Sequence, residues 1–159
     1  MKVSIGKFPK NPEAARKVNI KVDKWDSWNA DQTIAMIAYP LLVQLKTTKQ
    51  GAPHVDDEDV PEELRTYNSK PGQDKYDIDS NHFNRWNYVL DEIIWTMKEI
   101  AEGCPTEDSF YDWSACEEGD NFKESYEKLK VNHEGLQQYH DRLDKGCVLL
   151  GKYFRNLWD

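Results

Sequence analysis

The sequence has little cysteine and lacks long apolar runs, and each of these absences excludes a class of protein. Three cysteines stand at positions 104, 116 and 147 without a Cys-x-x-Cys spacing, so at least one thiol is unpaired. Such usage is typical of a reducing compartment rather than of a secreted domain held by disulfides. No run approaches the 18 apolar residues of a membrane-spanning helix, and the first residues lack the apolar centre of a signal peptide. We therefore expect a cytoplasmic protein that does not contact membranes.

Basic residues are also in deficit. The chain carries 21 Lys and Arg against 29 Asp and Glu, which gives a formal net charge of −8. A duplex-binding protein needs basic side chains to neutralise phosphates, and a negative field repels polyanions. A local basic patch remains within residues 7–24, but we expect no general nucleic-acid binding.

The common catalytic signatures are missing as well. The sequence contains no GxSxG, GxxxxGK(S/T), HExxH or GxGxxG pattern, so serine-nucleophile, P-loop, zincin and dinucleotide-binding interpretations have no support. Its four histidines and three cysteines do not stand at the spacings of a tetrahedral zinc site. We expect no cofactor and no tightly bound transition metal, and the interpretation leans away from an enzyme.

What the chain does contain predicts one mostly α domain (α+β class) over residues 1–159. Six Trp, eight Tyr and five Phe supply large buried areas, and this length can bury a core without staples. Residues 1–24 form a β element, because Val18–Asp23 alternates apolar and polar side chains and Val3–Ile5 does so more briefly. We expect this element to be a small N-terminal β-hairpin or sheet.

Three long helices are predicted, at residues 29–49, 80–102 and 121–157. Asn29 caps the first with Gln32 reaching back, and Pro40 should kink it. The third begins at Asn121 or Asn132 and ends at Leu157. The residues expected on the buried stripe of each helix follow a helical period. They are Ile34, Ile37, Ala38, Leu41, Leu42 and Leu45 in the first; Phe83, Trp86, Val89, Leu90, Ile93, Ile94, Met97, Ile100 and Ala101 in the second; and Leu136, Tyr139, Leu143, Cys147, Leu150, Phe154 and Leu157 in the third.

Two loops connect these helices. Residues 50–79 form a long acidic loop with one short helix near Pro61–Arg65, and residues 103–120 form an irregular acidic linker. The middle helix carries Tyr88 and Trp95 on the side opposite its core stripe. We favour an intramolecular layer over these rings, from the N-terminal sheet or from residues 110–113, and a homodimer through them is the alternative.

An acid run and two histidines complete the site-type residues. Asp56–Glu63 places six carboxylates in eight positions, which could hold a divalent cation, although a solvated loop is the usual outcome. His140 and His133 share the apolar face of the third helix. A histidine in such a place is more often a hydrogen-bonded core residue than a ligand.

The start of the second helix is the predicted ligand site. Its free amides and partial positive charge suit an anion, which Arg85 would pair while Trp28 or Trp86 stacks on it. An internal anion, with Asp56 or Asp57 folding onto the helix start, is slightly favoured over a bound ligand. The residues considered for ligand binding are Trp28, His54, Asp57, His82, Arg85, Trp86, Glu92 and His140.

Several strings in the chain resemble a family of uncharacterised proteins encoded by tailed bacteriophages, marine and cyanobacterial phages among them. The strings are Trp25-Asp26-Ser27-Trp28, the segment from Gly51 to Pro61, Asn81-His82 with Arg85-Trp86 and Val89-Leu90-Asp91-Glu92, and Gly151-Lys152-Tyr153-Phe154 with Leu157-Trp158-Asp159. The resemblance implies a viral accessory protein acting in the host cytoplasm. It implies no activity, cofactor or catalytic residue.

Three functions are compatible with these features. The leading hypothesis is a non-enzymatic accessory protein that binds a host protein or sequesters a small polar, nucleotide-like or anionic ligand. The second is a small metal-dependent hydrolase with His82 as base or ligand; its cluster would be His54, Asp56, Asp57, Asp59 and Glu92. The third is an acidic mimic of nucleic acid that blocks a host protein.

Overall fold

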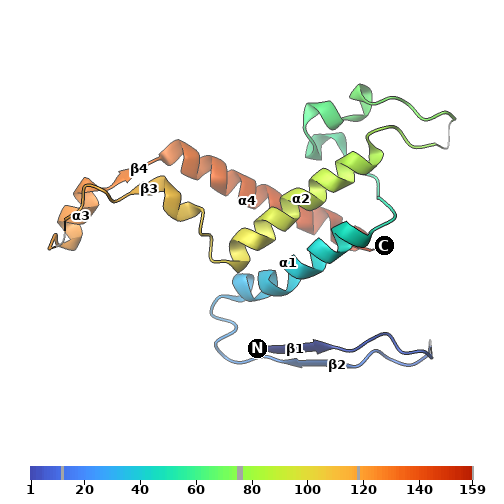
Figure 1. The fold of residues 1–159 in the computed structure, drawn as a ribbon, viewed down its shortest axis with the longest axis horizontal. Helices are drawn as coiled ribbons and strands as arrows, with labels where there is room; N and C mark the ends of the chain where they lie inside the picture. Colours follow the sequence, from blue (N-terminus) through green and yellow to red (C-terminus); the bar gives the residue numbers. More distant parts are fainter. Residues whose placement is uncertain (12, 75–76, 118, 159) are drawn as a thin grey trace.

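The structure is a computed structural model that describes residues 1–11, 13–74, 77–117 and 119–158. Three long helices dominate it: α1 (Ala30–Thr48), α2 (His82–Ala101) and α4 (His133–Tyr153) (Figure 1). The prediction of a mostly helical protein with an N-terminal hairpin is confirmed. Among the described residues, no helix combines the length and the apolar character that crossing a bilayer requires.

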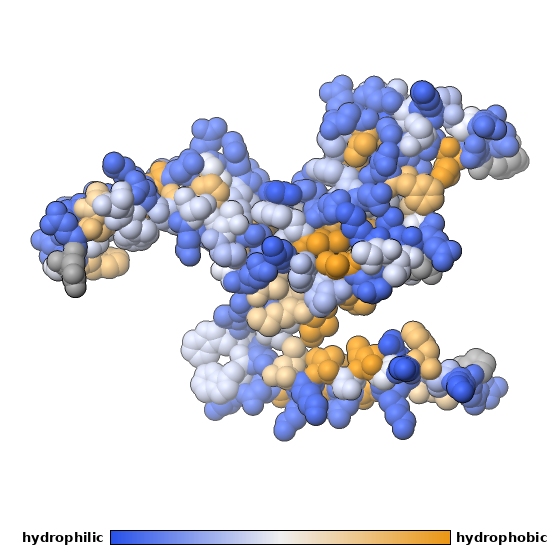
Figure 2. Space-filling view, viewed as in Figure 1, coloured by the Kyte–Doolittle hydropathy of each residue, from blue (hydrophilic) through white to orange (hydrophobic). Residues whose placement is uncertain are grey.

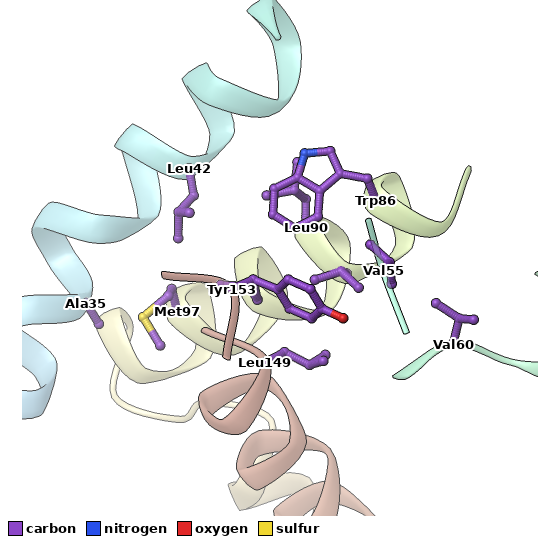
Figure 3. Packing of buried hydrophobic residues seen from close by; sticks show 11 residues of the cluster. Ala35, Leu42, Val55, Val60, Trp86, Leu90, Met97, Leu149 and Tyr153 are labelled. Atoms are coloured by element: carbon purple, nitrogen blue, oxygen red, sulfur yellow. The ribbon is translucent and has the colours of Figure 1, made fainter. Parts of the chain in front are cut away.

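The middle helix α2 lies between α1 and α4, and the core forms on both of its sides. Trp86, Leu90 and Ile93 are fully buried, which confirms most of the stripe that the helical period predicts for α2. Leu42 reaches this core from α1, and Tyr153 from α4 packs its ring edge against Trp86 with centroids 5.8 Å apart (Figure 3). Burial against two neighbours explains why α2 carries apolar residues around so much of its circumference.

The rings of Tyr88 and Trp95 are half-buried against α4. Lys145 donates a hydrogen bond to the Tyr88 hydroxyl over 2.8 Å, and the Arg142 guanidinium lies 3.9 Å from the centre of the Trp95 ring. Tyr139 adds an edge contact to Trp95. The layer over these rings therefore comes from α4, and not from the N-terminal sheet. A homodimer through them remains a prediction.

The segment predicted as one helix at residues 121–157 contains two helices. Short α3 (Phe122–Lys128) begins at Asn121, whose side chain accepts from the amides of Lys123 and Glu124. The chain then pairs β4 (Lys130–Val131) antiparallel with β3 (Tyr111–Asp112), and Asn132 caps α4. The start of the long helix at Asn121 is wrong, because a strand pairing and a second capping asparagine interrupt the segment, whereas the alternative start at Asn132 is confirmed. The predicted linker 103–120 accordingly contains β3 and the 3₁₀ turn η4 (Glu107–Phe110).

The long loop at residues 50–79 contains three 3₁₀ turns, η1 (Asp57–Asp59), η2 (Glu62–Leu64) and η3 (Thr66–Asn68). The short helix expected near Pro61–Arg65 corresponds to η2. At the start of α1 the side chain of Asn29 makes no capping hydrogen bond, contrary to the prediction. The Gln32 side chain donates to the carbonyl of Ala101 instead, over 3.4 Å, which ties the start of α1 to the end of α2.

The buried faces of α1 and α4 are rotated from those predicted. On α1, Ala35 and Leu42 are buried, whereas Ile34 and Leu41 are 62% and 67% exposed. α1 is apolar around most of its circumference, so periodicity alone could not select its inner face. On α4, the face that packs against α2 consists of Tyr139, Gly146, Leu149 and Tyr153. Cys147 and Phe154, which the heptad pattern placed in the core, are exposed.

The N-terminal hairpin consists of β1 (Lys2–Ile5) and β2 (Val18–Lys21), paired antiparallel with Val3 opposite Ile20 and Ile5 opposite Val18. It extends beside α1 as a separate ribbon (Figure 1). Because partners across a strand pair share a face, one face of the ribbon is apolar and the other carries Lys2 and Lys21. Ile5, Val18 and Ile20 of the apolar face are exposed, and Val3 is half-buried.

Candidate functional site

A cavity of about 650 Å³ opens beside the first turn of α2. Three parts of the chain line it: the segment before the acid run, the loop at residues 66–79, and α2 itself. The residues that bear on its chemistry are His54, Thr66, Ser69, Asp77, Asp79, His82 and Arg85. The structure thus brings together three predicted site residues, His54, His82 and Arg85.

Arg85 is buried and is held by Asp79 in a two-point ion pair. Its Nη1 donates to Asp79 Oδ1 over 3.0 Å and its Nη2 to Asp79 Oδ2 over 2.5 Å. Nη1 also donates to the carbonyl of Leu64 over 3.1 Å. These hydrogen bonds hold the pKa of the Asp79 carboxyl well below its usual range. The Nε atom of Arg85 is buried and has no hydrogen-bond partner in the structure.

Asp79 also organises the start of α2. Its carboxylate accepts from the amide of Asn81 over 2.9 Å, and its carbonyl accepts from the amide of His82 over 3.2 Å. The internal anion that satisfies this helix start is therefore Asp79, not Asp56 or Asp57 as predicted. The same carboxylate neutralises Arg85, so helix geometry and charge compensation depend on one side chain.

The two histidines of the cavity have different surroundings. His82 is half-buried, and its Nε2 lies 3.0 Å from the carbonyl oxygen of Ala52. Because a carbonyl only accepts, Nε2 carries the proton and donates it, which fastens the segment around Ala52 to α2. His54 is exposed, and its Nε2 lies 3.5 Å from Asp56 Oδ1. His54 is therefore the more accessible imidazole at this cavity.

Three carboxylates of the acid run are paired with a cation of α4, although Glu58 is 79% exposed. Lys152 Nζ lies 2.8 Å from Asp56, 3.1 Å from Glu58 and 2.6 Å from Asp59. The Tyr153 hydroxyl donates to Asp59 over 2.5 Å and accepts from the amide of Asp56 over 3.1 Å. Burial, together with the hydrogen bond to Asp59, raises the pKa of Tyr153 to about 12.

Asp57 lies apart from the carboxylates that Lys152 pairs, and it holds the first residue of η3. It accepts from the amide and the hydroxyl of Thr66, over 2.8 and 2.9 Å. Within the part of the chain that the structure describes, no group of three or more His, Cys, Asp or Glu side chains is arranged to hold a metal ion. The acid run is therefore the part of the long loop that attaches it to α4.

The remaining predicted site residues lie elsewhere. Glu92 accepts two hydrogen bonds from Arg142, over 3.2 and 2.9 Å, on the side of α2 that faces α4. Trp86 is buried in the core, Trp28 is 78% exposed beside Trp25 at the base of the hairpin, and His140 lies 3.6 Å from Glu107. None of these four side chains lines the cavity.

Sequence reasoning missed the cavity residues Asp79, Asp77 and Ser69. Asp79 had a local signal, since an Asp six residues before an Arg at a helix start can return to pair with it. Asp77 accepts from the amides of Gln73 and Ile78, which shapes the loop and leaves no sequence pattern. Comparison of the chain with protein-family models, with curated proteins and with solved structures finds no match.

Proposed function

We propose that the protein is a non-enzymatic binding protein that holds a small polar ligand in the cavity beside α2. The observation that carries this proposal is the convergence of His54, His82 and the Arg85–Asp79 pair on one cavity of about 650 Å³. Ligand sites are typically concave and of about 300–1,000 Å³, with few polar groups that fix orientation. The buried ion pair makes one wall rigid, and the two imidazoles can donate and accept hydrogen bonds.

The charge of the described lining favours a neutral or cationic ligand. Asp79 neutralises Arg85, and Asp77 adds a further carboxylate to the lining. A nucleobase or an amine would meet hydrogen-bond acceptors here, whereas a phosphate would meet carboxylates. The anionic ligand that the helix start suggested is therefore the second choice, because the Arg85 charge is already paired.

The hydrogen bonds of the two hydroxyl groups that line the cavity favour binding over catalysis. Thr66 Oγ1 donates to Asp57, and Ser69 Oγ donates to the carbonyl of Thr66, so neither is paired with an imidazole base. The hydrolase hypothesis loses its geometry for a separate reason. Arg142 pairs Glu92 on one side of α2, and Lys152 pairs Asp56 and Asp59.

The biological setting of this proposal rests on the resemblance to phage proteins. A phage accessory protein of this kind would act in the host cytoplasm, where it would sequester its ligand or present it to a host protein. The nucleic-acid mimic is less favoured, because Lys152 engages three of the six carboxylates of the acid run.

Calorimetric titration of the full chain with adenosine, cytidine, putrescine and inorganic phosphate tests the proposal. We expect binding of at least one neutral or cationic probe and no binding of phosphate. His54→Ala removes an exposed imidazole and should weaken that binding at least tenfold while the melting temperature stays unchanged. His133→Ala, an exposed histidine outside the cavity, is the matched control and should bind as the natural chain does.

A second variant separates the cavity from the rest of the surface. Ile78 lines the cavity and is 45% exposed, so Ile78→Trp fills the space without disturbing the core. Binding should be lost in Ile78→Trp and kept in Ile78→Val. Binding that survives the tryptophan, or the failure of all four probes at millimolar concentration, would refute the proposal, and binding of phosphate alone would select the anionic ligand.

A further inference from the structure

The hairpin and α1 each expose an apolar face that has no covering layer. On the hairpin, Ile5, Val18 and Ile20 are 50%, 57% and 56% exposed. The hairpin face lies on the side of the ribbon that is turned towards α1, where apolar side chains gather in Figure 2. On α1, Ile34, Ile37 and Leu41 form a stripe at helical spacing and are also exposed.

A face of this kind needs a cover. A two-stranded ribbon is marginally stable in water unless its apolar face packs against something. A helix that is apolar on both sides is normally buried between layers. In the described part of the chain α1 packs against α2 on its inner side, while its outer stripe and the ribbon face stay exposed.

The base of the hairpin is fixed by Asp26, which ties it to the first turn of α1. The Asp26 carboxylate accepts from the N-terminal ammonium over 2.9 Å and from the amide of Asp23 over 2.6 Å. Its carbonyl accepts from the Thr33 hydroxyl in the first turn of α1 over 3.1 Å. These contacts set the direction in which the ribbon leaves α1, and they leave both apolar faces open.

Charge separates the hairpin from the rest of the chain. Residues 1–28 contain seven Lys and Arg against three Asp and Glu, which gives this segment a net charge of +4. The remaining residues carry a net charge of −12, so the whole chain has −8. The hairpin of one copy is therefore attracted to the body of another. Each chain thus carries one apolar face on the positively charged hairpin and another on α1, in the negatively charged remainder of the chain.

We infer that two copies of the chain associate by exchanging their hairpins, so that the ribbon of each covers the outer stripe of the partner's α1. Such a contact is closed by a two-fold axis, because each copy gives one ribbon and receives one. Seven apolar side chains on each copy become buried, four from the ribbon including Val22 and three from α1. This is the apolar centre that an interface of about 20–30 residues on each side requires.

Sedimentation velocity on the full chain tests this inference. The natural chain should sediment as a dimer of the 18.7 kDa chain at tens of micromolar. The double variant Ile34→Lys/Leu41→Lys should be monomeric, with a dissociation constant raised at least a hundredfold and an unchanged helical circular dichroism spectrum. Val148→Lys on α4, combined with Phe154→Lys directly after this helix, changes two side chains of similar exposure, 66% and 67%, and should remain dimeric. Added salt should weaken the dimer, because the hairpin and the body attract by charge.

Cross-linking between different chains distinguishes exchange from other dimers. Chains with Ile20→Cys and chains with Leu41→Cys, both with Cys147→Ser, are mixed and oxidised. A disulfide between the two kinds of chain supports the exchange. A single chain carrying both cysteines that links only to itself would show that the ribbon closes on its own α1. That result, a monomeric natural chain, or a dimer that survives the α1 double variant would each overturn the inference.

Discussion

Gly146 of α4 and Thr96 of α2 mark the closest approach of these two helices. A Cβ at position 146 would lie 1.9 Å from Thr96 Oγ1 and 3.1 Å from the carbonyl oxygen of Glu92. No side chain fits there, so glycine is required by space rather than by backbone conformation. The crossing brings Tyr139 and Leu149 onto α2 and thereby determines which face of α4 is buried.

Gly146→Ala should therefore destabilise the protein by about 1–3 kcal/mol, the usual range for overpacking a core. Urea unfolding followed by circular dichroism measures this. Gly151→Ala is the matched control in the same helix, because nothing lies within 4 Å of a Cβ there. It should stabilise by up to about 1 kcal/mol, the helix preference of Ala over Gly. Equal effects of the two changes would contradict the close approach.

Asp79→Asn tests the buried ion pair. The variant leaves Arg85, which is 2% exposed, without its counter-charge and should lose about 3–5 kcal/mol of stability at pH 7. The pKa of Asp79 is lowered in the folded chain, so its contribution is complete above the unfolded value of about 3.9 and is lost as pH falls below it. The difference between the natural chain and the variant should consequently shrink in acid.

The control for this experiment is Asp77→Asn, which changes an exposed carboxylate of the same cavity. Its cost should stay below that of Asp79→Asn, because Asp77 holds loop amides and no buried cation. Urea unfolding curves from pH 7 down to pH 3 measure both variants. A difference for Asp79→Asn that does not change with pH would show that the ion pair is not its source.

Lys152→Ala tests the docking of the acid run. Three carboxylates lose their cation, and Asp56 and Asp59 then repel each other, so the segment should detach locally. We expect amide exchange in residues 56–60 to accelerate at least tenfold while α2 exchange stays slow. Lys98→Ala, which removes an exposed helix pair at 3.9 Å, should change neither. Unchanged exchange in Lys152→Ala would mean that the buried Val55 and Val60 and the hydrogen bonds of Tyr153 hold the segment without Lys152.

The sequence predicted those parts of the fold that local periodicity determines. The stripe of α2 is correct because its apolar residues are concentrated on the side that both neighbours bury. α1 offered apolar residues on two sides, and the choice between them depends on where α2 lies. On α4 the predicted stripe followed nearly a heptad spacing, yet the small Gly146 allows the helix to pack against α2 through residues one position earlier.

Three of the eight residues predicted for ligand binding line the cavity, and the pairing of its charges was not predicted. His54, His82 and Arg85 do meet at the start of α2, as the helix signals indicated. The pairing of Asp79 with Arg85 was not predicted, and it neutralises the charge on which the expectation of an anionic ligand depended. The cation of the acid run could not be predicted, because Lys152 lies 94 residues from Glu58 in sequence.

That separation has a consequence for the order of folding. α1 and α2 can associate as soon as the loop between them closes, but the segment at residues 55–60 has its partners, Lys152 and Tyr153, near the other end of the chain. Contacts between residues so far apart in sequence form late, because the entropy lost on closing the intervening loop is offset only when most of the chain is already ordered. During synthesis the acid run therefore stays undocked until the last helix has left the ribosome, and the first half of the protein matures only when the second half is complete.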